Sequence, residues 1–162
     1  MDKAEAQNSL EGIRGWLILV LIGILITPIR IGLMLAQTHI PMFSDGTWSA
    51  LTSPSSESYH HLWGPLLAFE MAGNIAVITL ALITLLFFLR KSRHTPKIAI
   101  IWLLSGFVFV VADYFLAEQI PAIAEIATDA ETFKEVARST IGVLIWVPYF
   151  LVSKRVKATF IR

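Results

Sequence analysis

The sequence predicts an all-α integral membrane protein, a four-helix bundle with its N- and C-termini in the cytoplasm. Three observations predict this fold. Hydrophobic residues make up 56% of the 162 residues and charged residues only 15%, whereas soluble globular chains have about 45–50% and about 25%. The apolar residues gather in four runs, and Lys and Arg gather at alternate ends of these runs. The length leaves room for a single four-span domain.

The four apolar runs approach the length that a membrane span requires, because crossing about 30 Å of hydrocarbon takes about 20 helical residues. They cover residues 15–36, 66–89, 98–116 and 139–152. The fourth run is short, but the preceding Thr128-Asp129-Ala130-Glu131 fits a capping box. We therefore expect one helix from about Asp129 to Lys157, whose first two turns form a short outer-face segment before the span. Pro148 should kink this helix.

The positions of Lys and Arg predict the orientation of the spans. Residues 90–97 and 154–162 each carry several basic residues and no acid, whereas residues 31–69 contain no Lys or Arg. The segment 117–137 is acidic. By the positive-inside rule, the termini and the 90–97 loop face the cytoplasm. A cleaved signal peptide is the rival interpretation of the first run; the mixed charge before it and Arg30 within it argue against cleavage.

Composition excludes several classes of function. A net charge of +1 argues against nucleic-acid binding, and the lack of cysteine excludes disulfide scaffolds, thiol catalysis and thiolate metal sites. The outer-side His39, His60 and His61 lack the spacing of a metal motif, so we expect ordinary loop histidines and no metal. No cofactor or nucleotide motif occurs, and we expect neither a cofactor nor an enzyme.

Ionisable residues inside the spans are the feature most relevant to function. Arg30, Glu70, Asp113 and Arg138 each lie within or at the edge of a different span, and their formal charges sum to zero. At 1.5 Å per residue, Glu70 lies roughly 28 Å from the cytoplasmic face and the other three roughly 22 Å. Each lies on the small, polar face of its helix, and Asn74 lies one turn below Glu70. We therefore expect all of them to point inward.

Consecutive antiparallel spans are usually neighbours, which predicts that Arg30 pairs with Glu70 and Asp113 with Arg138. Two interpretations of this intramembrane cluster stay open. The pairs could be purely structural, because an unpaired charge in hydrocarbon costs about 2.5–3.5 kcal/mol. Alternatively they line a polar pocket, open to the outer face, that binds a cation, a proton or an anion.

A motif stands at the end of the chain. The stretch from Ile145 to Arg162 reads IWVPYFLVSKRVKATFIR. The pattern W-x-P-Y-F-x-x-S-x-R-V-x-x-T-F falls on Trp146, Pro148, Tyr149, Phe150, Ser153, Arg155, Val156, Thr159 and Phe160. Together with Gly15–Leu17, and Phe69-Glu70 followed by Asn74, it resembles the bacterial inner-membrane family catalogued as domain of unknown function 2569.

This resemblance covers essentially the whole chain. It implies a multi-pass protein of the bacterial cytoplasmic membrane and brings no activity with it. In physical terms, the basic residues after Pro148 place the end of the helix at the cytoplasmic headgroups. Thr159 and Phe160 would then re-enter the interface or dock on a partner.

The leading functional hypothesis is a non-enzymatic accessory, scaffold or interaction protein, acting with a membrane-protein partner or as a homo-oligomer in the lipid bilayer. The alternative is a small ion- or proton-coupled transporter that uses the outer-leaflet cluster. Such a carrier would work as a dimer, since one four-helix bundle has little room for an alternating-access cavity. An intramembrane enzyme ranks third, because Glu and Asp could exchange protons but nothing supplies a nucleophile.

Overall fold

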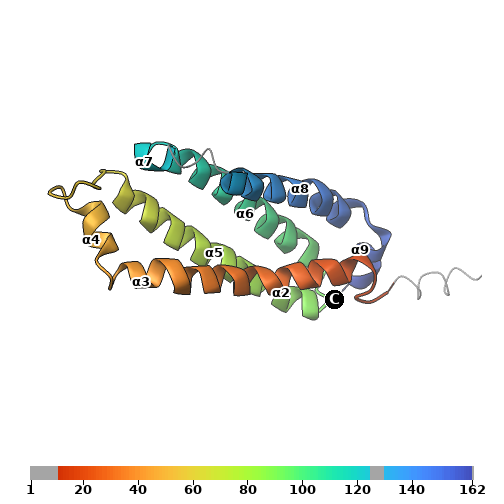
Figure 1. The fold of residues 1–162 in the computed structure, drawn as a ribbon. Helices are drawn as coiled ribbons and strands as arrows, with labels where there is room; N and C mark the ends of the chain where they lie inside the picture. Colours follow the sequence, from red (N-terminus) through yellow and green to blue (C-terminus); the bar gives the residue numbers. More distant parts are fainter. Residues whose placement is uncertain (1–10, 125–129, 162) are drawn as a thin grey trace, which may run out of the picture.

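The computed structural model describes residues 11–124 and 130–161, and in these ranges the chain is helical without strands (Figure 1). Four long helices run antiparallel, and these are α2 (Trp16–Met34), α5 (Trp63–Leu89), α6 (Thr95–Ala117) and α8 (Ala130–Val152). Each belongs to a helical stretch long and apolar enough to cross a membrane: Trp16–Met42, Trp63–Leu89, Thr95–Ala117 and Phe133–Val152. The predicted all-α fold, with four helices long and apolar enough to span a membrane, is confirmed.

Large apolar side chains cover the outside of the bundle. Ile29 on α2, Leu86 on α5, Val108 on α6 and Leu144 on α8 are all more than half exposed. In water these side chains would favour aggregation, whereas hydrocarbon solvates them as well as a protein interior does. The apolar residues that predict the spans therefore also supply the lipid-facing surface of the four helices.

The first span is longer than the 15–36 run suggests. α2 passes without a break into a π-helical turn, η1 (Leu35–His39), and then into α3 (Ile40–Met42). A π-turn inserts an extra residue into the helical path and is frequent at functional sites. Here it carries His39 into the bundle, where only 6% of the residue is exposed. The short α4 (Thr47–Thr52) follows and leads to α5.

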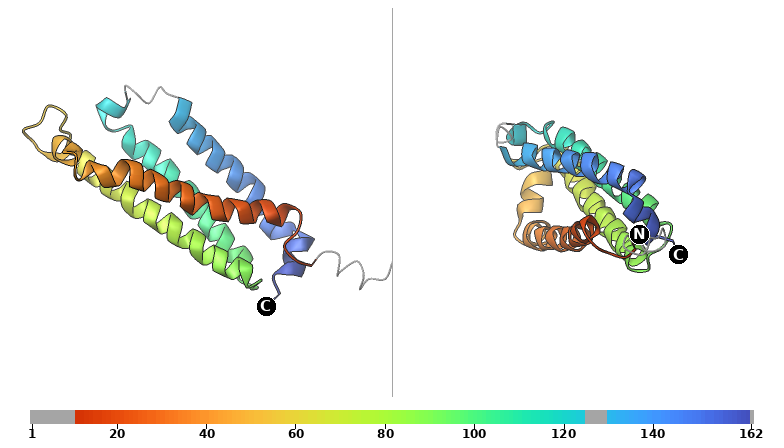
Figure 2. Two further views of the ribbon diagram at one scale, coloured as in Figure 1. Left: turned by 60° about the horizontal axis from the view of Figure 1, so that its bottom comes forward. Right: turned by 90° about the vertical axis from the view of Figure 1, so that its right-hand side faces the viewer.

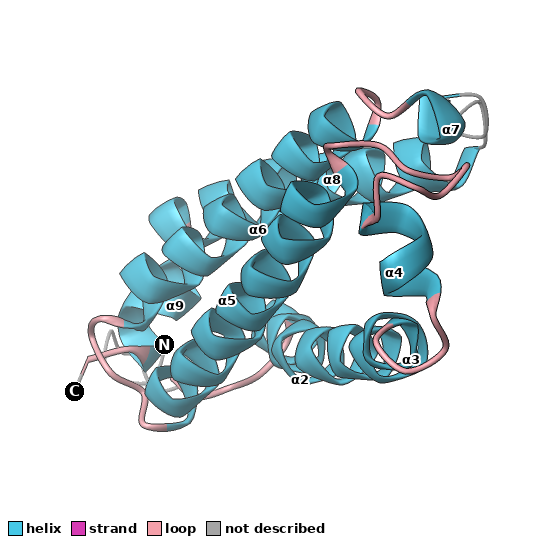
Figure 3. Cartoon of the chain, turned by 90° about the vertical axis from the view of Figure 1, so that its left-hand side faces the viewer, coloured by secondary structure: helices cyan, strands magenta, loops and turns pink. Residues whose placement is uncertain are grey.

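The long helices pack in the order of the chain. α2 packs on α5, α5 on α6, and α6 on α8, and Figure 3 shows α5 between α2 and α6. α2 and α8 therefore lie at the two ends of this row, and each packs closely on one long helix among the described elements. The row is a curved layer rather than a bundle closed on every side.

The two ends of the layer, here called the terminal end and the long-loop end, hold different segments of the chain. The terminal end holds the start of α2, the 90–94 loop and the short α9 (Lys154–Thr159); the long-loop end holds α3, α4 and α7 (Pro121–Ala124). Figure 2 shows α9 beside the start of α2. Whether the terminal end faces the cytoplasm remains a prediction from the basic residues.

The single helix expected from Asp129 to Lys157 is wrong, because α8 ends at Val152. Ser153 adopts an extended conformation (φ −63°, ψ 122°), and its hydroxyl accepts a hydrogen bond from the Val156 N–H at 3.4 Å. Ser is a favoured N-cap because its oxygen satisfies a free N–H of the next helix. The chain therefore turns at Ser153 and starts α9. The expected capping box involves Thr128 and Asp129, which lie outside the described residues.

α9 closes the terminal end of the layer. Its Val156 and the following Phe160 are buried, and the Phe160 ring meets Phe88 of α5 edge to face, with centroids 5.1 Å apart. The Thr159 hydroxyl donates a hydrogen bond to the Gly12 carbonyl at 3.1 Å. Thr159 and Phe160 thus dock on their own chain.

A charged cavity between the four long helices

A cavity of about 460 Å³ lies between the four long helices, in the half of the layer nearer the long-loop end. Its Arg, His, Asp and Glu lining residues come from all four spans, and they are Arg30, His39, Glu70, Asp113, Glu135 and Arg138. The five residues that the sequence singled out inside the membrane, Arg30, Glu70, Asn74, Asp113 and Arg138, all line this one cavity. The structure therefore brings them together.

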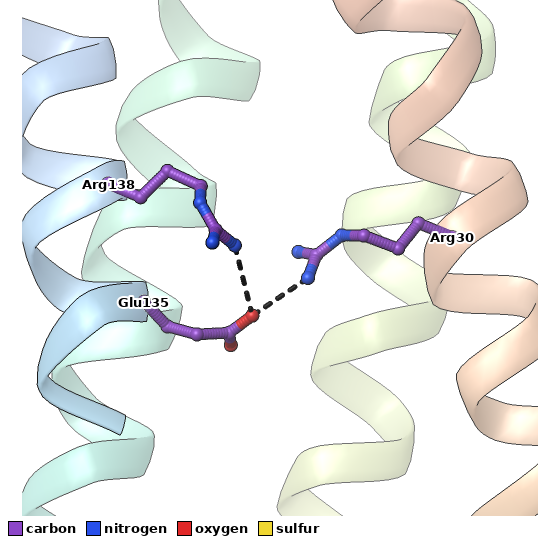
Figure 4. Close-up of polar contacts among 3 residues, drawn as sticks. All are labelled: Arg30, Glu135 and Arg138. Atoms are coloured by element: carbon purple, nitrogen blue, oxygen red, sulfur yellow. Dashed lines mark hydrogen bonds and ion pairs between the residues drawn. The ribbon is translucent and has the colours of Figure 1, made fainter. Parts of the chain in front are cut away.

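Their ion pairs differ from the expected ones. Arg30 Nη1 lies 2.8 Å from Glu135 Oε1, and Arg138 Nη1 lies 3.8 Å from the same oxygen. Figure 4 shows the guanidinium groups of Arg30 on α2 and Arg138 on α8 directed at the carboxylate of Glu135, which is also on α8. The predicted pairing of Arg30 with Glu70 and of Asp113 with Arg138 is wrong. The Arg30 side chain extends from α2 toward α8, with which α2 does not pack closely, and not toward α5, on which α2 packs.

Glu70 has a different base as its partner. Its Oε2 lies 3.0 Å from Nε2 of His39, which the π-turn places opposite α5. Because an ionised carboxylate only accepts hydrogen bonds, Nε2 carries the proton in this contact and Nδ1 of a neutral imidazole is an acceptor. Asn74, one turn further along α5, donates to the backbone carbonyl of Glu70 at 2.8 Å.

Two acceptor atoms of the cavity wall lack hydrogen-bond partners within the described part of the chain. They are Nδ1 of His39 and Oδ1 of Asp113, and both are buried. An unsatisfied buried polar group costs about 1–3 kcal/mol. The wall therefore contains hydrogen-bonding capacity that the protein itself does not use.

The deeper part of the cavity is apolar and spacious. Trp102 and Phe107 of α6 and Val143 of α8 line it. Gly106 and Gly142 also line it, and a Cβ at either glycine would find no described atom within 4 Å. Small residues at these positions keep the cavity open.

The sequence interpretation did not include His39 and Glu135 in the cluster. A signal for His39 was present: the buried positions Leu17, Val20, Ile24 and Ile31 recur at helical spacing, and His39 lies eight residues beyond Ile31. Ending the span at residue 36 hid this continuation. Glu135 precedes Arg138 by three residues and so shares its helix face, but it was counted with the acidic outer segment.

The C-terminal motif lies away from the cavity. Trp146 on α8 meets Trp16 on α2 edge to face at 6.0 Å between centroids, and Tyr149 lies 5.8 Å from Trp146. Phe150 is buried, Pro148 lies inside α8 and Arg155 lies in α9. These residues lie toward the terminal end, where they make packing contacts and do not line the cavity.

The described residues contain no group of three or more His, Asp or Glu that could hold a metal ion. His60 and His61 stack on each other in the loop before α5, with ring centroids 4.5 Å apart. The polar centre of the molecule is therefore the charged cavity, defined by its six Arg, His, Asp and Glu residues.

Comparison with known protein families gives a match over most of the chain. A family model described as "Protein of unknown function (DUF2569)" matches residues 10–161. No curated protein and no solved structure shows a significant match to the chain.

Proposed function

Since the chain belongs to the DUF2569 family of proteins of unknown function, we propose its function from its geometry: it is a non-enzymatic membrane carrier that binds a small polar or ionised molecule in the charged cavity. One observation carries the proposal. Six Arg, His, Asp and Glu side chains from four different spans line a single cavity of about 460 Å³. Ligand-binding pockets typically enclose about 300–1,000 Å³.

The energetics of charge in a membrane support this proposal. Ionisable groups inside spans are costly, and they commonly mark substrate or ion pathways. A purely structural cluster would satisfy its members, whereas His39 and Asp113 each keep an unpartnered buried atom within the described chain. The polar half of the cavity is therefore better explained by a ligand than by helix register alone.

We place the carrier in the cytoplasmic membrane of a bacterium, with the terminal end inside. The basic residues of the 90–97 loop and of the 154–162 tail support this orientation. In that orientation the charged half of the cavity lies in the outer leaflet. Coupling to protons or ions would act through the carboxylates of Glu70 and Asp113. In the cavity Glu70 pairs with His39 and Glu135 with Arg30, which supports a binding role over an enzymatic one.

A second candidate, an accessory or scaffold protein, is favoured by the open order of the helices. α2 and α8 each pack closely on a single long helix among the described elements. A partner helix, or a second copy of the chain, could pack along these two helices. Cysteine cross-linking at Ile29 and Leu144, both exposed, would reveal a partner there as a specific covalent adduct in native membranes.

The test of the carrier is ligand-induced thermal stabilisation of the purified protein in detergent. A ligand at 100 times its Kd stabilises the folded state by about 2.7 kcal/mol. Gly106→Leu and Gly142→Leu fill the cavity and should abolish the response to any molecule that binds there. Gly32→Leu is the matched control, because Gly32 has equally open space but does not line the cavity. If all three variants respond like the wild type to every molecule that stabilises it, the cavity is not the binding site.

A further inference from the structure

We propose that the cavity takes a zwitterion, a small molecule or headgroup with a primary ammonium at one end and a phosphate or carboxylate at the other. This inference rests on the proposed function and specifies the ligand of the same site. It follows from two kinds of hydrogen-bonding groups in the wall. The donors are the guanidinium groups of Arg30 and Arg138, and the buried acceptors belong to His39 and Asp113.

The anionic group is matched by two arginines. Arg30 and Arg138 come from α2 and α8, at the two ends of the helix row, yet both direct a nitrogen at the single oxygen Oε1 of Glu135. Each guanidinium has five N–H donors, and the side chains of Arg30 and Arg138 are 57% and 67% exposed. The Glu135 carboxylate thus shows how an oxyanion sits between them. A phosphate or carboxylate ligand has further oxygens for the remaining donors.

The ammonium is matched by two acceptors. Nδ1 of His39 and Oδ1 of Asp113 are buried and have no partner in the described ranges, and both residues line the cavity. Only 6% of His39 is exposed, and its Nε2 already contacts Glu70. With His39 neutral, both buried atoms are acceptors, and a primary ammonium offers three N–H groups and a positive charge. A plain anion would leave these acceptors unsatisfied, and a plain amine would gain nothing from the two guanidinium groups.

The shared chemistry has two sources, a free zwitterion or the headgroup of a lipid. The apolar wall at Trp102, Phe107 and Val143 would accept an acyl chain. α2 and α8 are not among the closely packed helix pairs, so an acyl chain would enter between them. Phosphoethanolamine and the monoacyl lipid lysophosphatidylethanolamine share the primary ammonium and a phosphate, as a monoester in the first and a diester in the second, and separate these two cases.

The experiment measures Kd values by calorimetry for the full-length protein in maltoside detergent. The probes are phosphoethanolamine, phosphocholine, inorganic phosphate and ethanolamine. Phosphocholine is the matched control, because its quaternary ammonium keeps the charge but has no N–H. Phosphoethanolamine should bind at least about tenfold more tightly than each of the other three, as loss of hydrogen bonds to charged groups predicts. This comparison uses the wild type and so does not depend on the folding of any variant.

Substitutions then assign the two ends. Asp113→Asn should weaken phosphoethanolamine to the level of phosphocholine and leave the Kd for phosphate unchanged. Arg138→Gln should weaken phosphate and phosphoethanolamine alike, whereas Arg93→Gln in the 90–94 loop should change neither. Lysophosphatidylethanolamine binding tighter than phosphoethanolamine, with the gain lost in Gly106→Leu, identifies a lipid; equal affinities identify a free zwitterion.

Equal Kd values for phosphoethanolamine and phosphocholine, or for phosphoethanolamine and phosphate, would overturn the zwitterion. So would a failure of all four probes to bind. In those cases the proposed function is judged separately, by whether Gly142→Leu abolishes stabilisation by molecules that do bind. If Gly142→Leu abolishes that stabilisation, the proposal of a carrier stands with a different ligand. If Gly142→Leu leaves it unchanged, the proposed function is overturned as well.

Discussion

The ring of Phe109 on α6 lies directly against the backbone of Gly73 on α5, so closely that a Cβ at position 73 would overlap the ring. Phe69, one turn before Gly73, meets the same ring with centroids 5.3 Å apart. Gly73 therefore sets the distance between α5 and α6, two of the helices that form the cavity.

Gly73→Ala should destabilise the protein by about 1–3 kcal/mol, because added methyl groups in a packed interior force side chains and backbone to move. Thermal unfolding in detergent measures the change. Gly32→Ala is the control: its Cβ meets no described atom within 4 Å, and replacing Gly by Ala in a helix normally gains up to about 1 kcal/mol. Adding Phe109→Leu to Gly73→Ala should recover part of the loss. An unchanged stability of Gly73→Ala would contradict this contact.

The Arg30–Glu135 ion pair should show energetic coupling across the open side of the helix row. In a double-mutant cycle with Arg30→Gln and Glu135→Gln, we expect about 0.5–1 kcal/mol, because both side chains are about half exposed. The parallel cycle with Arg30→Gln and Glu70→Gln should give a coupling near zero. The opposite ranking would restore the pairing of Arg30 with Glu70.

Loss of the His39 side chain should expose the dependence of Glu70 on its partner. His39→Ala leaves a partly buried carboxylate without its donor and should cost about 1–3 kcal/mol in thermal unfolding. His39→Gln supplies an N–H donor and should recover part of that cost. His61→Ala is the control, since His61 is exposed in the loop, and surface changes usually stay within about 0.5 kcal/mol. Equal effects of His39→Ala and His61→Ala would show that the His39–Glu70 contact contributes nothing.

The packing of the C-terminal segment against α5 at the terminal end should depend on Phe160. Phe160→Ala should destabilise the protein by about 3–5 kcal/mol, as removal of a buried aromatic ring does, because it vacates the contact with Phe88. Ile161→Ala, at the adjacent exposed position, should have little effect. Proteolysis of the tail should accelerate in the first variant alone, and similar cleavage rates in both would refute the role of Phe160.

The orientation is tested by reporter fusions to the intact chain. Fusions after Arg93 and after Arg162 should report the cytoplasm, and fusions near Ser55 and Asp129 should report the outside, because the basic residues stay on the inner side. A cytoplasmic signal at Ser55 would reverse the orientation and place the charged cavity in the inner leaflet.

The four spans and the meeting of the charged residues could be predicted from the sequence, because both depend on distance along a helix. Apolar length identifies a span, and a rise of 1.5 Å per residue gives the depth of Arg30 or Asp113. The pairing could not be predicted in this way. It depends on the direction in which each helix faces, and counting does not reveal that α2 turns Arg30 toward α8.

The π-turn and the break at Ser153 were missed for a local reason. Residues 37–39 are polar, so the apolar run appears to end before His39, although the helix continues. At the other end, Ser153 is one polar residue between apolar and basic neighbours, and only its hydrogen bond to Val156 shows that it starts a new helix. In both places local hydrogen bonds decide the outcome: those of the π-turn continue the first helix to His39, and the bond between Ser153 and Val156 starts a new helix.

The hydrogen bond from Thr159 to Gly12 joins the segments just before α2 and just after α8. α2 and α8, which are not among the closely packed helix pairs, are thus joined at one end, where Trp16 and Trp146 also meet. A rotation of α2 relative to α8 would therefore displace the helices least at this end and most toward Arg30 and Glu135. Such a rotation would separate the ion pair between these two residues.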